Sequence, residues 1–337
     1  MKISVALCTY NGSKYLRDQL NSLFSQSRKV DEIVVCDDQS TDSTMDILHA
    51  FKKQYPEVLN IRQNNKKLGA RNNFENAISV CSGDIIFLCD QDDIWYDSKV
   101  AVSVDWLAMH PQMLGVFCNG NLISKDKVAI KQTMWDNLGF NQERRSQLEP
   151  KDLFNYLLIN GNIASGTTIA IRKEAKKYIL PFYLPADTWH DHWIALMLSA
   201  IHKFHCIDKP LLDYRIHKSQ LVGFDVISNQ KTSGSTFKSS LKIDIQTIEK
   251  CDEELTMKIV HAISRYQLFK SAIQQRCNVG ECKLDAFEKQ LNQLLYHHKK
   301  SWLKKTIPFV PRKIKILKHW LKGGEYLQMS FKDIFTI

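Results

Sequence analysis

Three carboxylates, Asp90, Asp92 and Asp93, follow a short apolar segment at Asp84–Cys89. Crowded carboxylates repel one another, and a divalent cation between them relieves that repulsion. Alternate side chains of an extended chain point the same way, so Asp90 and Asp92 are spaced to face one ion. Mg²⁺ or Mn²⁺ then completes its coordination with diphosphate oxygens. An isolated triplet of this kind is more often a solvated capping loop, but its position after an apolar strand favours a metal–diphosphate site.

A further carboxylate, Asp191, stands among aromatic residues in the segment Trp189-His190-Asp191-His192-Trp193. A positioned carboxylate serves as a general base toward a hydroxyl, and aromatic side chains stack on sugar rings. The competing interpretation is a helix N-cap, because Asp is favoured there. Taken alone, the residues favour the cap. Neither His190 nor His192 is assigned to proton transfer.

The elements that must position these side chains follow from the hydrophobic pattern. Short apolar segments alternate with segments of helical periodicity. The expected strands are residues 3–8, 32–36, 60–62 and 84–89. This alternation predicts an α/β fold with a mostly parallel central sheet and helices on both faces. Ligands of such sheets bind at the carboxyl ends of the strands, which here carry Thr9–Asn11, Asp37–Asp38 and Asp90–Asp93.

The later part of the chain is mixed. A glycine-containing loop at Gly161–Gly166 has the glycine spacing of a P-loop but lacks its lysine, and no GxGxxG follows the first strand. A kinase, a P-loop ATPase and a dinucleotide dehydrogenase are therefore excluded. The polar stretch Ser228–Ser240 predicts a linker before helices at 241–275 and 286–295. We expect a catalytic domain at 1–225 and a helical C-terminal region at 226–337.

The charge is concentrated near the C-terminus. The chain has 46 Lys and Arg against 36 Asp and Glu, a net charge of +10. Residues 299–322 contain many of these cations and no Asp or Glu, so the remainder is close to neutral. Apolar and basic side chains of 312–322 fall on opposite helical faces, which is typical of an interfacial membrane helix. The alternative is a helix packed on the protein's own core. No recognised nucleic-acid-binding module accompanies the charge.

Location follows from composition. No apolar run reaches the ~18–20 residues of a spanning helix. The first residues, Met1–Cys8, resemble a strand and not a signal peptide. Nine cysteines without a CxxC pair are expected to be reduced and not to bind metal. A cytoplasmic protein at the inner face of a membrane is the expectation.

Three segments together resemble family 2 inverting glycosyltransferases of the GT-A fold. They are Val5–Asn11, Ile33–Asp42 and Leu88–Trp95, and they occur in the family's order. The Asp-Gln-Asp-Asp-Ile-Trp sequence is similar to that of bacterial rhamnosyltransferase-like members, which build O-antigen, capsule or cell-wall polysaccharides. The resemblance covers roughly residues 1–225 and implies a Rossmann-like GT-A catalytic domain.

The resemblance implies a set of residues that bind the sugar-nucleotide donor: Thr9, Tyr10, Asn11, Asp38, Arg71, Asp90 and Gln91. Within it, Asp38 is expected to accept hydrogen bonds from the edge of a pyrimidine base. Arg71 either lies near the base or diphosphate or is an exposed cation at a helix start.

The resemblance also implies a metal site and a base. Asp90 and Asp92 are expected to hold Mg²⁺ or Mn²⁺, with Asp92 the stronger choice for direct ligation. His217, in a segment similar to the family's Tyr-Arg-x-His sequence, either completes the metal sphere or contacts the diphosphate, or is an exposed loop histidine. Gln220 stands where many relatives carry Asn. Asp191 occupies the base position of the His-Asp-x-Trp motif.

These implications describe an inverting transferase. It is expected to move a sugar, with rhamnose a candidate, from a UDP- or dTDP-linked donor to a polyprenyl-linked saccharide at the inner membrane surface. The alternative from another class is a non-catalytic adaptor that binds sugar nucleotides or polyanions in the same pocket. A nucleotidyltransferase is a more distant option.

Overall fold

The computed structural model describes residues 1–183, 188–220, 265–267 and 269–276. All of them belong to one of two compact units, the one that comprises residues 1–241 and 262–284. The predicted linker at 228–240, the domain boundary at 225 and the basic tail lie outside the described residues. Within the described ranges, no helix is both long enough and apolar enough to cross a membrane.

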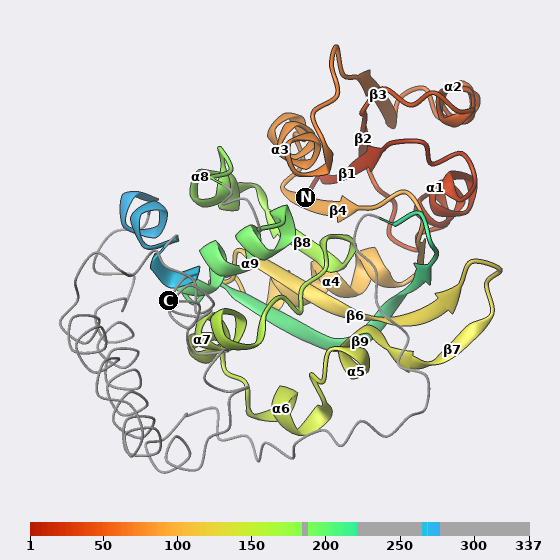
Figure 1. Ribbon diagram of the computed structural model, residues 1–337. Helices are drawn as coiled ribbons and strands as arrows, with labels where there is room; N and C mark the ends of the chain where they lie inside the picture. Colours follow the sequence, from red (N-terminus) through yellow and green to blue (C-terminus); the bar gives the residue numbers. More distant parts are fainter. Residues whose placement is uncertain (184–187, 221–264, 268, 277–337) are drawn as a thin grey trace, which may run out of the picture. The chain divides into compact units, whose positions relative to one another are not determined.

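The first half of the fold follows the predicted alternation and is parallel (Figure 1). Its elements are β1 (Ile3–Thr9), α1 (Leu16–Phe24), β2 (Glu32–Asp37), α2 (Thr44–Gln54), β3 (Leu59–Gln63), α3 (Ala70–Val80) and β4 (Ile85–Cys89). The strand order is β3-β2-β1-β4, so β1 lies between β2 and β4. Every residue of β1 is buried, as the continuous apolar run of a strand covered on both faces predicts.

The second half of the sheet is mixed. Its elements are β5 (Ile94–Trp95), α4 (Lys99–Met109), β6 (Gly115–Ser124), β7 (Ala129–Thr133), α5 (Met134–Asn137), α6 (Gln142–Gln147), α7 (Pro150–Asn160), β8 (Ile169–Arg172), α8 (Lys176–Ile179), α9 (His190–Ala200) and β9 (Phe204–Ile216). Two 3₁₀ helices are η1 (Gly166–Thr168) and η2 (Lys173–Ala175). Strand β8 runs antiparallel between β4 and β6, β9 pairs parallel with β6, and β5 and β7 add antiparallel pairs with β9 and β6.

The strand register brings distant loops to one edge. Thr9 pairs with Asp37 and Leu7 pairs with Cys89, so the chain leaves β1, β2 and β4 at neighbouring points. Because β8 is antiparallel to β4, the start of β8, with η1 just before it, lies beside the end of β4. The predicted acidic edge therefore also receives the loop that precedes β8.

The described cysteines are free and buried: Cys8, Cys36, Cys81, Cys89, Cys118 and Cys206. Burial raises the pKa of the Cys36 thiol to about 11 and that of Cys81 to about 12. Thiols in such surroundings stay protonated and unreactive at neutral pH. They act as small apolar side chains of the core.

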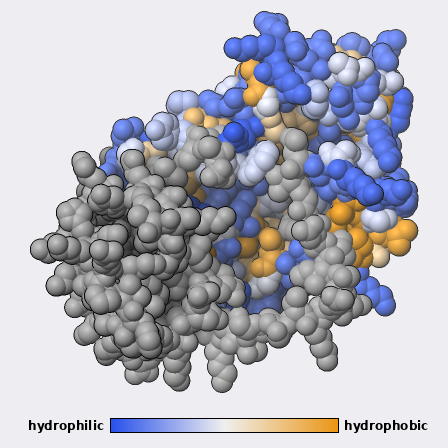
Figure 2. All heavy atoms as spheres, in the orientation of Figure 1, coloured by the Kyte–Doolittle hydropathy of each residue, from blue (hydrophilic) through white to orange (hydrophobic). Residues whose placement is uncertain are grey.

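Polar atoms cover most of the surface around α2 and β3, whereas apolar atoms gather over the hairpin of β6 and β7 (Figure 2). Val128, in the turn of that hairpin, is 64% exposed. The turn also carries Lys125 and Lys127. The hairpin turn therefore presents an exposed apolar side chain next to charged residues.

Candidate active site

The loop after β4 holds the predicted acidic cluster. Desolvation raises the pKa of Asp90 to about 8, and repulsion from Asp92 and Asp191 adds to the rise. Asp93 is fully buried, and burial together with its acidic neighbours raises its pKa well above the usual range. Its Oδ1 accepts a hydrogen bond from the Arg215 backbone N–H at 3.1 Å, while its Oδ2 has no partner among the described residues. The protein surroundings therefore do not compensate the negative charge that ionisation of Asp90 and Asp93 would place in this loop.

Asp191 lies in the first turn of α9, close to the predicted helix start. The N-cap position belongs to Trp189, so Asp191 does not cap the helix. Its Oδ1 accepts from the His192 N–H at 2.7 Å, and its Oδ2 accepts from the Gly166 N–H at 3.2 Å. Burial raises the pKa of Asp191 to about 6 against the lowering effect of these bonds. Such a carboxylate is ionised at neutral pH and is a stronger base than an exposed one.

Gly166 joins the two acidic groups. The point where a β-carbon on Gly166 would lie is 2.9 Å from His190 Nε2 and 3.7 Å from Asp90 Oδ2. The backbone N–H of the same residue donates to Asp191. Residues from the ends of β4 and the starts of η1 and α9 thus face one space, although they are far apart in the sequence.

The residues expected to bind the nucleoside lie at the neighbouring strand ends. Asp38 accepts backbone N–H bonds from Leu68 at 2.7 Å and from Gly69 at 2.8 Å, so its carboxylate fixes the loop before α3. The Tyr10 backbone exchanges two hydrogen bonds with the Gln91 side-chain amide, at 2.9 and 3.0 Å. Gln91 therefore ties the loop after β1 to the acidic loop after β4.

Three other predicted donor residues differ in exposure. Thr9 is 1% exposed and donates its hydroxyl to Asp37 Oδ1 at 2.9 Å, so its side chain belongs to the core and does not line a pocket. Asn11 is exposed and adopts a left-handed backbone conformation with φ 48°. Arg71 is partly buried, and its guanidinium donates to the Thr188 carbonyl at 3.2 Å. Arg71 thus reaches the segment just before Asp191.

His217 meets the acidic loop directly. Its Nε2 is 2.8 Å from Asp92 Oδ2, and its Nδ1 is 2.9 Å from the Ser219 hydroxyl. Gln220 closes the segment, because its amide accepts from the His217 N–H at 3.1 Å and donates to the Arg215 carbonyl at 2.6 Å. The exposed-histidine interpretation is therefore wrong.

The acidic loop suits a metal ion that a ligand helps to coordinate. Over the described ranges, no three His, Cys, Asp or Glu side chains converge as a complete metal site. Asp90 and Asp92 nevertheless offer carboxylate oxygens, burial disfavours the charge of Asp90, and Asp93 Oδ2 is buried without a partner among the described residues. Mg²⁺ and Mn²⁺ require few protein ligands when phosphate oxygens are present. The donor set fits such an ion.

Comparison with known proteins decides the family. Residues 4–179 match the family model described as Glycosyl transferase family 2. The chain belongs to glycosyltransferase family 2. This matched range contains the whole acidic loop and the loops after β1 and β2.

Similar proteins support this assignment. The glycosyltransferase is 31% identical over 231 residues to the dTDP-rhamnosyl transferase RfbG of Shigella flexneri, an alignment that covers 65% of this chain and 74% of RfbG. It is 26% identical to the uncharacterized glycosyltransferase alr2836 of a Nostoc species, over 64% of this chain and 65% of that one. The crystal structure of S. aureus TarS residues 1–349 with UDP-GlcNAc superposes with a TM-score of 0.52 at 17% identity, covering 96% of this chain and 88% of TarS. The predicted GT-A fold is confirmed.

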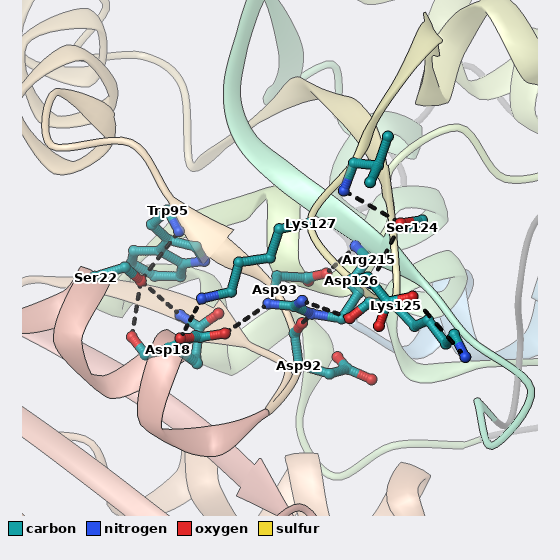
Figure 3. Close-up of polar contacts among 12 residues, drawn as sticks. Asp18, Ser22, Asp92, Asp93, Trp95, Ser124, Lys125, Asp126, Lys127 and Arg215 are labelled. Atoms are coloured by element: carbon teal, nitrogen blue, oxygen red, sulfur yellow. Dashed lines mark hydrogen bonds and ion pairs between the residues drawn. The ribbon is translucent and has the colours of Figure 1, made fainter. Parts of the chain in front are cut away.

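Sequence reasoning missed the role of Arg215 in the glycosyltransferase. This guanidinium is 1% exposed and lies where α1, the acidic loop and the β6–β7 turn meet (Figure 3). It donates to the Asp92 carbonyl at 2.8 Å, to Asp18 Oδ2 at 3.0 Å and to the Lys125 carbonyl at 3.2 Å. With its backbone bond to Asp93, Arg215 fixes both aspartates that follow Gln91.

Replacing Arg215 with methionine is expected to lower the free energy of unfolding by about 3 kcal/mol, because the change leaves the Asp92 and Lys125 carbonyls without their buried donor and removes one of the two cations paired with Asp18. Lys127 pairs with the same Asp18 at 2.8 Å, but its side chain is 55% exposed. Lys127→Met should therefore change the free energy of unfolding by less than about 0.5 kcal/mol. Urea unfolding of both variants tests this contrast, and equal losses would show that Arg215 has no special part in the fold.

Proposed function

We propose that this glycosyltransferase moves a sugar from a nucleoside-diphosphate donor to a saccharide acceptor with inversion at the anomeric carbon. The observation that carries the proposal is the placement of Asp191 across Gly166 from Asp90. An inverting displacement needs a base on the face of the sugar opposite the leaving group. A carboxylate with a pKa near 6, facing a separate acidic loop, suits that position.

Asp191 takes the proton of the attacking acceptor hydroxyl in this proposal. Hydrogen bonds from the Gly166 and His192 N–H groups orient its carboxylate and still leave lone pairs for the acceptor. The C–O bond from acceptor to sugar forms as the bond from sugar to diphosphate breaks. The leaving nucleoside diphosphate carries away the electron pair.

Asp90 and Asp92 would hold Mg²⁺ or Mn²⁺, and His217, paired with Asp92, orients that carboxylate or joins the coordination sphere. A bound divalent ion neutralises charge that develops on the leaving diphosphate. Tyr10, Asn11, Asp38 and Arg71 are proposed to line the nucleoside side. Thr9 supports this side from the core through Asp37.

The similarity to the dTDP-rhamnosyl transferase RfbG makes dTDP-rhamnose the first donor to test, and UDP-linked sugars are the second proposed class. The proposed acceptor is a polyprenyl-linked saccharide in the synthesis of O-antigen, capsule or cell-wall polysaccharide. A thermal-shift screen of dTDP-rhamnose, UDP-glucose and UDP-N-acetylglucosamine, each with and without Mn²⁺, tests donor binding. Mn²⁺-dependent stabilisation followed by release of nucleoside diphosphate supports the enzyme. Binding without release would instead support the adaptor, and no binding would contradict both.

We propose that the enzyme works at the cytoplasmic face of the inner membrane. The cations of residues 299–322 and the exposed Val128, which follows Lys125 and Lys127 in the β6–β7 turn, support contact with anionic lipid. A domain boundary near 225 would leave the catalytic domain, 1–225, separate from this basic region.

Truncation after Gln293 is expected to move most of the protein from the membrane fraction to the soluble fraction of a cell lysate. The same truncated enzyme should keep its donor binding. The full-length protein with Val128→Ser is the milder control, and only a minor part of it should move to the soluble fraction. An unchanged distribution of the truncated protein would contradict a role of the tail in membrane attachment.

A further inference from the structure

His190 is a buried polar side chain for which the mechanism above has no use. It is 6% exposed and begins α9, next to Asp191. One face of its ring stacks on Phe74 of α3, with ring centroids 4.0 Å apart and an angle of 13° between planes. Stacking against a buried aromatic ring fixes the orientation of the imidazole.

Both ring nitrogens of His190 lack a hydrogen-bond partner among the described residues. Burial lowers the pKa of His190 to about 3, so the ring is neutral at physiological pH. A neutral imidazole offers one donor and one acceptor. Native proteins rarely leave such buried groups unpaired, because each costs a lost hydrogen bond. A bound ligand is therefore the partner to consider.

The direction of the ring identifies that ligand's position. Nε2 points at Gly166 and lies 2.9 Å from the place of its missing β-carbon, a point that is 3.7 Å from Asp90 Oδ2. Gly166 also donates to Asp191. The unpaired nitrogen thus faces Gly166, which lies between the acidic loop and the proposed base. A side chain on residue 166 would come too close to the imidazole ring, which explains the glycine there.

His192 provides a contrast on the other side of Asp191. It too is largely enclosed, burial lowers its pKa to about 4, and its Nε2 also lacks a partner among the described residues. Its neighbours, however, are the Leu157 backbone and Arg265, which belong to α7 and to the helical residues 265–267. The two histidines therefore flank the same carboxylate, but only His190 faces the site.

We propose that His190 hydrogen-bonds a hydroxyl of the sugar being transferred. The proposal rests on the proposed function, because a sugar held between a diphosphate at Asp90 and an acceptor at Asp191 must occupy the space that Nε2 faces. The rigid ring selects a donor whose hydroxyl reaches it. His190 is then a residue that determines sugar specificity, distinct from the residues that bind the nucleotide.

The test compares a sugar nucleotide with its nucleoside diphosphate. The probe is whichever of dTDP-rhamnose, UDP-glucose and UDP-N-acetylglucosamine stabilises the wild type, and its partner is dTDP or UDP. His190→Phe keeps a ring to stack on Phe74 but removes both nitrogens. It should weaken binding of the sugar nucleotide about tenfold, the loss of one good hydrogen bond, and leave nucleoside diphosphate binding within about twofold. His190→Gln, which retains a donor and an acceptor, should recover most of the loss.

The matched control is His192→Phe, which should weaken the binding of both ligands equally or leave both unchanged. The inference would be overturned if His190→Phe weakened the binding of the sugar nucleotide and of the nucleoside diphosphate equally. It would also be overturned if the folded variant bound the sugar nucleotide as tightly as the wild type. A loss confined to the KM of the acceptor would also overturn it. If no sugar nucleotide stabilises the wild type, the proposed function itself fails, and that outcome is separate from the behaviour of the variants.

Discussion

Asp191→Asn is expected to lower kcat by about 10² to 10⁴-fold, the usual contribution of a general base, while the enzyme still binds its donor. Asparagine keeps the shape of the side chain, and its carbonyl oxygen accepts one of the N–H bonds now made by Gly166 and His192. The loss therefore falls on proton transfer and not on the fold. Initial rates of nucleoside diphosphate release, measured with saturating donor and acceptor, give the comparison.

The pH profile separates a base from a structural carboxylate. The base is active when ionised, and the pKa of Asp191 lies at about 6, so the wild-type rate should fall tenfold per pH unit below that value. Above it, this limb of the profile should be flat. The residual activity of Asp191→Asn should not show this decrease in rate below pH 6. A variant with unchanged turnover, or with the same acidic limb, would assign the base to another residue.

Asp90→Asn is expected to abolish transfer and at the same time to stabilise the protein without metal. The unfolded chain ionises Asp90 near pH 4, whereas the folded protein holds its pKa at about 8. Folding therefore takes up a proton between these values, and the contribution of Asp90 to wild-type stability falls as pH rises through them. Asparagine removes this penalty. The gain in unfolding free energy should be a few kcal/mol near pH 8 and should shrink toward pH 4.

Urea unfolding in EDTA at several pH values measures that gain, and Mn²⁺ titration by thermal shift measures the loss of the metal site. Asp126→Asn is the matched control, since this aspartate lies in the exposed β6–β7 turn. It should change neither quantity. If the Asp90→Asn protein were less stable than the wild type at pH 8, the folded protein would already compensate the negative charge of Asp90. Retained transfer activity would remove Asp90 from the metal site.

The sequence predicted which strand ends meet at one edge of the sheet because two local signals coincide there. Apolar runs end at Thr9, Asp37 and Cys89, and polar residues follow at once. Parallel pairing then forces those ends to one edge of the sheet. Asp191 needed the family resemblance, since the residues alone favoured a helix cap. The structure places Trp189 at the cap and turns Asp191 toward Gly166.

Other parts of the site depend on contacts that no local pattern encodes. Gly166 reaches Asp90 because β8 inserts antiparallel beside β4, a pairing between strands separated by much of the domain. The absence of a lysine from the Gly161–Gly166 loop argued against a P-loop, but it did not indicate where this loop lies in the fold. Arg215 is a residue type that is mostly exposed, and its burial results from partners on three separate segments, namely α1, the acidic loop and the β6–β7 turn. The left-handed Asn11 likewise follows from bonds to the loop after β2.

The anomeric configuration of the product tests the central claim most directly. A donor of known configuration is incubated with the enzyme, Mn²⁺ and a lipid-linked acceptor, and the anomeric proton of the product is observed by NMR. We predict one product with the configuration opposite to that of the donor, which is formed by wild type and not by Asp191→Asn. A product that retains the donor's configuration would contradict a single displacement with Asp191 as its base.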